Sequence, residues 1–337
     1  MRAYQFDRFD LASLTLRDVP SPLAGSGEVL VDVRAMSPNY RDLLVIRGLY
    51  NPKFKLPATP ISDGSGIVTA VGDGVTHVRI GDRVVTHFVT GWQDGELKAE
   101  YLGTTLGLPL AGMAAERVVL PAHAVVPIPA GLDFAEAATL PIAALTAWSA
   151  IVTEGNLQPG QTVLTLGTGG VSVFALQFAK AMGARVIITS SSDEKLARAR
   201  AMGADETVNY KHTPEWDRRV LELTGGRGVD LTVENGGIQT LDQSLRSTRA
   251  GGVIAMLGAV TGLQGPVNVA ACIMKRIRIA GVMVDSLAEY KRMLRFLVER
   301  GIRPVIDRRF DFLQLPAALG AMQSGGHFGK IVVTCDG

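Results

Sequence analysis

The sequence predicts an α/β protein of two domains, one of them built on a doubly wound parallel sheet. Residues 162–177 run from an apolar, β-favouring stretch through a glycine cluster into a helical pattern. Beyond them, β-favouring and helical segments alternate as far as residue 257, which is typical of a parallel sheet covered by helices. Residues 1–125 instead carry short β-favouring runs separated by glycine and proline, which favour a compact β-barrel-like domain.

Length and composition set the first limits. A chain of 337 residues allows about two domains, each with its own core. The net charge of +2 and the absence of a Lys/Arg-rich block argue against nucleic acid or an acidic membrane as a partner. The N-terminus has neither the signal-peptide nor the transit-peptide pattern, and two cysteines provide no disulfide framework, so we expect a cytoplasmic protein. The longest apolar run, 137–152, is too short and interrupted for a membrane span and predicts a buried helix pair.

The first 125 residues contain four expected strands. Val31, Val33 and Ala35 alternate with polar neighbours, as in a half-buried strand. The expected strands are 28–35, 67–71, 81–86 and 114–120. The proline- and glycine-containing stretch 127–131 predicts a boundary, which gives a first domain at 1–127 and a second that begins at 128.

The glycine cluster predicts a dinucleotide site. Gly167 can form the tight turn, and Gly169 allows a phosphate to approach the backbone. The amides that open the following helix, from Gly170 and Val171 onward, can then hold that anion in a favourable dipole. Ser172 replaces the third glycine of the usual pattern and is small enough to pack against the strand. This arrangement is typical of a Rossmann domain.

The rest of the second domain follows the same alternation. We expect a helix from Asp193, acting as N-cap, to Met202, with Gly203 ending it. A further helix is expected at 215–223. The remaining expected strands are 183–189, 205–210, 229–233 and 252–257.

Together these segments carry a family resemblance over nearly the whole chain. It rests on a series of motifs in characteristic order: Gly27–Val31, Pro38–Asp42, Ser62–Gly66, Val71–Gly72, Gly81–Val84, Ala138–Pro141, Leu145–Ala147 and Gly167–Ser172. The chain resembles the medium-chain dehydrogenase/reductases, and within them the zinc-free, quinone oxidoreductase-like branch. The resemblance implies an N-terminal GroES-like catalytic domain completed by 285–337, a nicotinamide-binding Rossmann domain at 128–284, and a site in the cleft between them.

Zinc ligands are not expected. Asn39, Asp63 and approximately Ile142 stand at the positions that match the catalytic zinc ligands of related alcohol dehydrogenases. An aliphatic side chain cannot ligate zinc, and two distant cysteines cannot form a four-cysteine site. The five histidines are scattered and fit surface or core positions better. A site without metal suits hydride delivery to an acceptor that is already electrophilic, such as a quinone or a conjugated enone.

The end of the second strand favours NADPH. NAD-preferring folds place an acidic residue about twenty residues beyond the glycines to bind the ribose hydroxyls, and Ser190 stands there. Ser190 and Ser191 can donate hydrogen bonds to a 2′-phosphate, and Lys195 adds positive charge. By resemblance, Tyr210 lies near that phosphate and Lys330 near the cofactor. Alternatively, these serines only surround a helix cap formed by Asp193.

Further cofactor contacts are implied by the resemblance alone. They fall at or after strand ends, where open α/β sheets bind ligands. The residues are Thr146, Asn235, Gly236, Leu257, Gly258, Val282 and Met283.

Two residues are the candidates for chemistry. By resemblance, Asn39 and Tyr50 match polar positions that face the substrate. Tyr50 can donate a hydrogen bond or a proton to the acceptor oxygen, although it could equally be a wall of the pocket, with water as the proton source. Asp42 fits a structural ion pair with Arg41 or Arg47, and Asp63 fits hydrogen bonding to the backbone.

The favoured interpretation is an NADPH-dependent reductase of quinones or related conjugated carbonyls that uses no metal. An enoyl-thioester or 2-alkenal reductase and a non-catalytic NADPH-binding redox sensor are the alternatives. The Gly-rich insertion 89–106 fits a lid or an oligomer contact equally well. Residues 276–284 resemble the edge strand through which family members pair, which predicts a homodimer.

Overall fold

The computed structural model describes residues 1–258 and 260–335, which divide into two compact units. Unit 1 comprises residues 1–143 and 285–337, and unit 2 comprises residues 144–284. The boundary therefore lies after the expected one at 127. Residues 128–143 belong to unit 1 because they are bonded to it: Ser65 Oγ donates to the Phe134 carbonyl at 2.7 Å, and Arg303 pairs with Glu136 at 2.8 Å.

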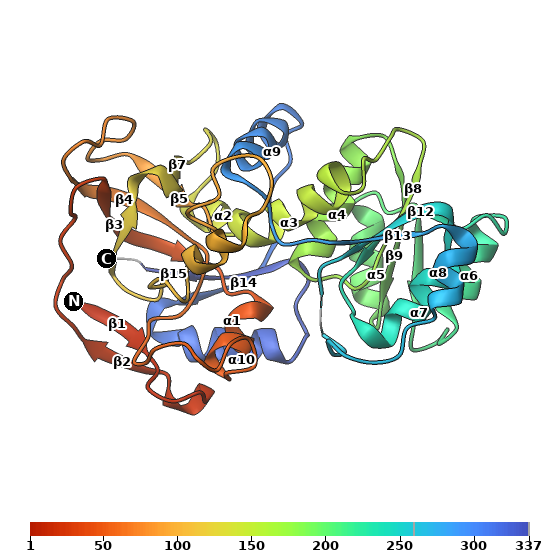
Figure 1. The fold of residues 1–337 in the computed structure, drawn as a ribbon, viewed down its shortest axis with the longest axis horizontal. Helices are drawn as coiled ribbons and strands as arrows, with labels where there is room; N and C mark the ends of the chain where they lie inside the picture. Colours follow the sequence, from red (N-terminus) through yellow and green to blue (C-terminus); the bar gives the residue numbers. More distant parts are fainter. Residues whose placement is uncertain (259, 336–337) are drawn as a thin grey trace. The chain divides into compact units, whose positions relative to one another are not determined.

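Unit 1 is built on a seven-stranded sheet that its C-terminal segment completes (Figure 1). The strands lie in the order β14-β15-β3-β4-β5-β7, and β6 pairs with β3. A separate antiparallel pair joins β1 to β2. The strands are β1 (Arg2–Gln5), β2 (Thr15–Asp18), β3 (Glu28–Met36), β4 (Gly64–Val71), β5 (Arg83–Thr86), β6 (Arg117–Pro121), β7 (Val125–Pro127), β14 (Ile306–Asp311) and β15 (Lys330–Thr334). The α-helices are α1 (Tyr40–Ile46), α2 (Phe134–Ala137), α9 (Leu287–Glu299) and α10 (Leu315–Gln323).

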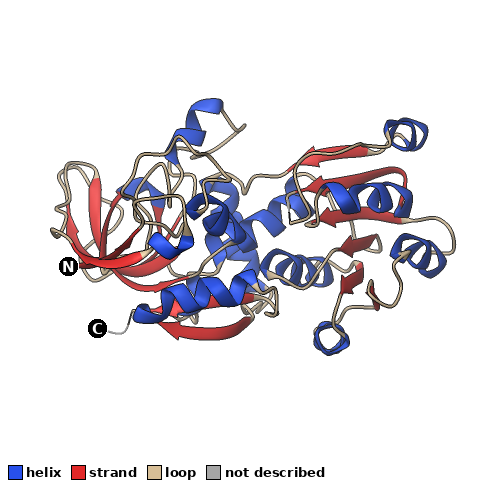
Figure 2. Ribbon diagram, turned by 90° about the horizontal axis from the view of Figure 1, so that it is seen from below, coloured by secondary structure: helices blue, strands red, loops and turns tan. Residues whose placement is uncertain are grey.

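Unit 2 is a six-stranded parallel sheet in the order β10-β9-β8-β11-β12-β13, with helices on both faces (Figure 2). This is the strand order of the Rossmann fold. The chain builds the sheet outward from β8 to one side, through β9 and β10, and then crosses to the other side at β11. The strands are β8 (Thr162–Thr165), β9 (Arg185–Ser190), β10 (Glu206–Asn209), β11 (Val229–Glu234), β12 (Thr248–Met256) and β13 (Arg278–Gly281). The α-helices are α3 (Leu145–Trp148), α4 (Gly170–Ala181), α5 (Asp193–Ala201), α6 (Trp216–Leu223), α7 (Ile238–Ser247) and α8 (Val269–Lys275).

The expected strands and helices of unit 2 are present, with shifted ends. The largest shift is in β12, which begins at Thr248 rather than 252. Its early start has a local cause, because Thr248 Oγ1 lies 2.8 Å from Thr232 Oγ1 on β11 and Val229 pairs with Thr248 before a bulge. The apolar run 137–152 forms short α-helical and π-helical segments whose side chains are almost all buried. No helix within residues 1–258 and 260–335 is long and apolar enough to cross a membrane.

Candidate functional site

The glycine turn of unit 2, residues 166–170, presents backbone and open space at the end of β8. Gly167 adopts a φ of +77°, a conformation that L side chains rarely take. A Cβ added at Gly167 or at Gly169 would meet no described atom within 4 Å. No described side chain caps α4, so its first-turn N–H groups face this space. The turn therefore fits a phosphate held by backbone donors at a helix N-terminus.

Ser172 and Asn235 hold the glycine turn in place. Ser172 Oγ donates to the Leu166 carbonyl at 2.8 Å, and Asn235 Nδ2 donates to Ser172 Oγ at 2.9 Å. Asn235 Nδ2 also reaches the Leu166 carbonyl at 3.3 Å. Ser172, in the place of a third glycine, thus packs closely and also fixes the turn to the loop after β11.

Glu234 joins the loops that follow β11 and β12, and sequence reasoning missed it. Its carboxylate is fully buried and accepts from the amides of Gly236 (2.7 Å) and Gly237 (3.1 Å) and from the Ser244 hydroxyl. The amides of Leu257 and Gly258 both donate to the Glu234 carbonyl at 3.1 Å. The sequence feature that could have identified Glu234 is an acidic residue at the end of an apolar strand, directly before Asn-Gly-Gly. Its bonds place Leu257 and Gly258 beside Asn235.

The serines after β9 divide into two roles. Ser192 caps α5, since its Oγ accepts from the Lys195 amide at 3.3 Å. The expectation that Asp193 is the cap was wrong, because the chain is still extended at Ser192 and Asp193 is already helical. Ser190 is buried at the end of β9, with its Oγ 3.4 Å from Thr168 Oγ1. Ser190 therefore faces the glycine turn rather than capping the helix.

The other predicted cofactor residues of unit 2 lie at varied depths. Ser191 and Lys195 are half-buried, and Tyr210 is exposed, with its amide donating to the Ser190 carbonyl at 3.1 Å. Thr146 is buried on α3. The Val282 amide is bonded to the Met256 carbonyl at 2.9 Å, and Met283 beside it is half-buried.

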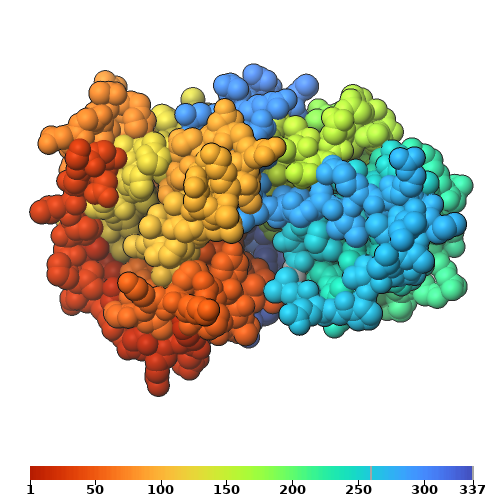
Figure 3. All heavy atoms as spheres, in the orientation of Figure 1, coloured from red at the N-terminus to blue at the C-terminus, as the bar shows by residue number. Residues whose placement is uncertain are grey.

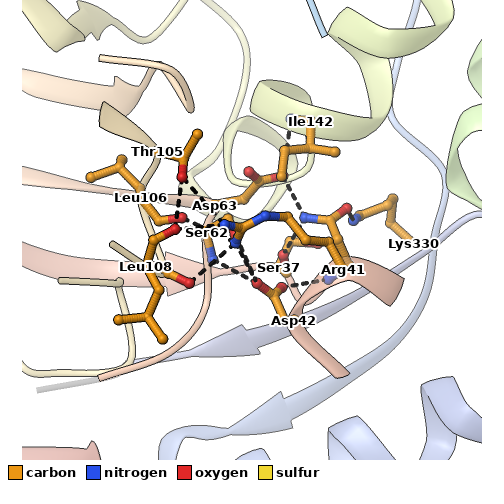
Figure 4. A network of polar contacts seen from close by, with 12 residues as sticks. Ser37, Arg41, Asp42, Ser62, Asp63, Thr105, Leu106, Leu108, Ile142 and Lys330 are labelled. Atoms are coloured by element: carbon orange, nitrogen blue, oxygen red, sulfur yellow. Dashed lines mark hydrogen bonds and ion pairs between the residues drawn. The ribbon is translucent and has the colours of Figure 1, made fainter. Parts of the chain in front are cut away.

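In unit 1, a buried polar cluster is formed by the side chains of Asn39, Asp63 and Lys330 and by the backbone amide of the half-buried Ile142. Figure 4 labels Asp63, Ile142 and Lys330. Asp63 Oδ2 accepts from Asn39 Nδ2 at 2.9 Å and from the Ile142 amide at 3.1 Å. The Lys330 ammonium donates to Asn39 Oδ1 at 2.7 Å and to the Pro38 carbonyl at 3.0 Å. An ammonium has no acceptor, so the oxygen of the Asn39 amide must face Lys330 and its NH₂ must face Asp63.

Burial sets the protonation of the buried polar cluster. Desolvation raises the pKa of Asp63 to about 7, although the Lys330 charge and the Asn39 hydrogen bond pull it down. Burial also lowers the pKa of Lys330, against the attraction of Asp63 and Asp42. We assign the proton to Lys330 at neutral pH, because both oxygens that it contacts are acceptors.

A second network starts at Asp42, which is also buried. Asp42 accepts from the amides of Asn39 (2.8 Å) and Ser62 (3.1 Å) and from the Ser62 hydroxyl (2.7 Å). The expected ion pair with Arg41 is long, at 3.9 Å. The Arg41 guanidinium instead donates to the carbonyls of residues 106–108, at 2.6–3.2 Å, and so ties α1 to the end of the insertion (Figure 4).

Tyr50 lies outside these networks. Tyr50 is 45% exposed, and the Arg41 guanidinium lies over its ring, 4.7 Å from the ring centroid, with Phe54 stacked at 6.5 Å. Asn39 is buried, and both of its N–H donors are used, one on Asp63 and one on the Ser37 carbonyl at 3.3 Å. The two predicted catalytic residues are therefore in different environments, and Asn39 has no spare donor.

The insertion 89–106 is an ordered part of unit 1. Its Trp92 and Gln93 carbonyls accept from the first amides of α9, those of Leu287 and Ala288, at 2.9 and 3.0 Å. Residues 93–100 are exposed.

Two family models match the chain. Residues 25–130 match the alcohol dehydrogenase GroES-like domain, and residues 170–299 match the zinc-binding dehydrogenase domain. These ranges fall in units 1 and 2, with the second running on into α9.

Known proteins are similar over almost the whole length. A zinc-type alcohol dehydrogenase-like protein of Schizosaccharomyces pombe is 42% identical over 325 residues, which cover 95% of this chain and 94% of the relative. A quinone oxidoreductase of Pseudomonas aeruginosa is 34% identical and covers 90% of both chains. A crystal structure from Sinorhizobium meliloti 1021, provisionally assigned as an alcohol dehydrogenase, is 40% identical, covers 99% and 98% of the two chains and superposes with a TM-score of 0.92. With both domains, their fold and their order in agreement, this chain belongs to the medium-chain dehydrogenase/reductase superfamily, whose oxidoreductases use nicotinamide cofactors.

Proposed function

We propose that the protein is an NADPH-dependent reductase of quinones or related conjugated carbonyls that works without a metal ion. The observation that carries the proposal is the buried polar cluster. The Asn39 oxygen and Asp63 Oδ2 already accept hydrogen bonds from Lys330, from Asn39 Nδ2 and from the Ile142 amide, so a metal ion would have to displace these bonds to use either atom.

The atoms that could coordinate a metal ion in this cluster argue against zinc. Asn39 presents its single oxygen to an ammonium, and Asp63 Oδ2 already accepts two N–H donors. Ile142 contributes only a backbone N–H, which cannot ligate a cation. Within residues 1–258 and 260–335, no three His, Cys, Asp or Glu side chains are grouped so that they could hold a metal ion. Without a Lewis acid, an acceptor that spreads negative charge over its own π-system is the most suitable substrate.

The cofactor proposal rests on unit 2. The glycine turn would hold the pyrophosphate, and the cofactor would supply a hydride when bound. Ser190 stands where an acidic residue would repel a 2′-phosphate, and Lys195 lies in the first turn of α5. The exposed acidic residues Asp193 and Glu194 weaken the attraction of Lys195 for a 2′-phosphate. We therefore propose a preference for NADPH rather than exclusion of NADH.

The test is oxidation of NADPH by purified protein against a panel of quinones and a panel of enones, with 2-alkenals and enoyl thioesters included. We expect turnover with quinones and no loss of activity after treatment with a chelator. Turnover with thioesters alone would favour the enoyl-thioester alternative, and cofactor binding without oxidation would favour the redox sensor.

We further propose a homodimer that forms through β13, which is an edge strand of the unit 2 sheet. Exposed apolar side chains occur in the segment that leads into it, between residues 260 and 279. This segment is drawn in cyan to blue in Figure 3. They are Val260, Leu263, Val267, Val269, Ile273, Met274 and Ile279. An open edge with an apolar border is suited to pairing with a second copy. Light scattering should give a dimer for the wild type and a monomer for Ile279→Lys.

We also place the protein in the cytoplasm. Cys272 and Cys335 form no disulfide within residues 1–258 and 260–335, and Cys335 is buried, which suits a reducing compartment. Fluorescent tagging of the protein in its native cell tests this location.

A further inference from the structure

An open groove of about 440 Å³ lies on unit 1 between the end of β7 and helix α9, both of which are labelled in Figure 1. Its volume falls within the range of small-molecule sites, roughly 300–1,000 Å³. Every residue that lines it belongs to unit 1, and none of them takes part in the glycine turn or in the buried polar cluster. The groove is therefore a candidate binding site of its own.

Bonds within unit 1 hold the two walls of this groove in place. The Arg303 guanidinium, just beyond α9, donates to the Gly131 carbonyl in the loop after β7. His87, which follows β5, lies with its Nε2 3.0 Å from the Asp285 carbonyl, just before α9. The His87 ring also stacks on Tyr290 of α9, with centroids 5.8 Å apart. Because β5 pairs with β7, these contacts fix α9 to the strand that forms the other wall, and a ligand need not order the groove.

The walls of the groove are mainly apolar. Val126 and Pro127 of β7 and the following Pro129 line one wall, and Leu294 and Val298 of α9 line the other. Val126 and Leu294 are buried, whereas Val298 is 49% exposed. β7 is the last strand in the order of the unit 1 sheet, but Pro127 has no N–H, so this edge is poorly suited to pairing with an added peptide strand. The surface suits a hydrocarbon chain better than a peptide backbone.

The charged residues of the groove come from one face of α9. Lys291 and Arg295 lie one helical turn apart, and both are exposed. Neither forms an ion pair in the part of the chain that the structure describes. Like charges at this spacing repel each other, so an anion that contacts both would relieve the repulsion. Glu299 lies one turn beyond Arg295 and makes that end of the groove negative.

We propose that this groove binds a free fatty carboxylate. The head group lies between Lys291 and Arg295, and the hydrocarbon chain packs against the apolar residues of both walls with its end toward Glu299. The planar Arg295 guanidinium can donate two parallel hydrogen bonds to a carboxylate, and the Lys291 ammonium adds a second positive charge. Glu299 restricts the ligand to one anionic group, because it repels a second one at the far end. This inference is independent of the proposed function, since it involves neither the cofactor nor the acceptor.

The binding test uses three probes of equal chain length: octanoate, octanol and octanedioate. Titration calorimetry with the purified protein should give a single saturable site for octanoate. Octanol lacks the charge and octanedioate carries a second carboxylate near Glu299, so we expect both to bind at least about fivefold more weakly.

The first variant tests the head-group site. Lys291→Gln combined with Arg295→Gln should weaken octanoate binding about tenfold and remove its advantage over octanol. Arg292→Gln combined with Arg300→Gln is the matched control, because it removes the same charge from α9 and its end but from positions outside the groove. The control should keep the octanoate affinity within about twofold, and both double variants should keep the melting temperature of wild type, since all four side chains are exposed.

The second variant tests the direction of the ligand. Glu299→Gln removes the negative charge at the far end, so it should raise the affinity for octanedioate about fivefold and change that for octanoate by less. An equal gain for both probes would contradict the proposed orientation.

The remaining outcomes decide the site itself. Octanol that binds as tightly as octanoate would show an apolar patch without charge recognition and would overturn the inference. An equal loss of affinity in the two double variants would show a general attraction to the cationic helix, and the absence of saturable octanoate binding would show that no such site exists. None of these results bears on the reductase proposal, which is tested by NADPH oxidation without octanoate.

Discussion

In unit 2 the proposed phosphate site is made of neighbours in sequence, whereas the buried polar cluster of unit 1 is assembled from residues 39, 63, 142 and 330. The glycine turn works through backbone N–H groups and open space, and it carries no charged side chain of its own. The cluster works through buried side chains whose charges depend on one another. A site made of backbone is therefore robust to pH, while a site made of buried acids and bases is not.

The sharpest difference is expected in the pH dependence of stability. The folded-state pKa of Asp63, about 7, is above its ordinary value of 3.8, so between these values the folded chain binds more protons than the unfolded chain. This contribution to stability is fully present below about pH 4 and is lost as the pH rises through about 7. The loss is at most about 4 kcal/mol, at about 1.4 kcal/mol per unit of pKa.

Urea unfolding of wild type and Asp63→Asn across pH 4–8 measures this loss, because titration of the other groups cancels in the difference. The introduced carboxamide imitates the neutral acid and does not titrate. The free energy of unfolding of the variant should therefore rise relative to that of wild type as the pH rises. Parallel curves would contradict a neutral, buried Asp63.

Removing the internal cation should have the next largest effect. Lys330→Met leaves Asn39 Oδ1 and the Pro38 carbonyl without their buried donor, and we expect a loss of about 3 kcal/mol in the free energy of unfolding. Lys180→Met is the control, since its ion pair with Asp205 is partly exposed and should contribute less than about 1 kcal/mol. Equal effects of the two substitutions would show that Lys330 is not coupled to the cluster.

How much the sequence could predict follows from the same contrast. The Rossmann sheet, Gly167, Gly169 and Ser190 are local patterns, and the strand order confirms the fold that they predict. The convergence of Asn39, Asp63 and Ile142 came from resemblance, and the structure brings all three together. Tyr290 carries no sequence signal, because one tyrosine on an amphipathic helix looks like any core residue. Its burial without a hydrogen-bond partner among the described residues is shown only by the three-dimensional structure.

The glycine turn can be broken without affecting the fold. Gly169 has a φ of −77° that any residue can adopt, and a Cβ there meets no described atom, so Gly169→Val should fold normally. Its side chain would occupy the space proposed for the phosphate and weaken NADPH binding about 10²-fold, or about 2.7 kcal/mol. Gly320→Val on α10 is a matched control with equally open space. An NADPH affinity that is unchanged in Gly169→Val, measured by fluorescence titration, would contradict a phosphate site at this turn.

The smallest expected effect concerns the choice of cofactor. Ser190→Asp places a carboxylate at the end of β9, where it would repel a 2′-phosphate and accept from ribose hydroxyls instead. We expect the NADPH-to-NADH ratio of kcat/KM to fall at least about tenfold, or about 1.4 kcal/mol, with Ser190→Asn as the uncharged control. The effect is limited because Ser190 is buried and lies beside Thr168, so the new charge is held back from the ribose. If the ratio does not change, the choice of cofactor would be assigned to Lys195 and Tyr210, which are more exposed than Ser190.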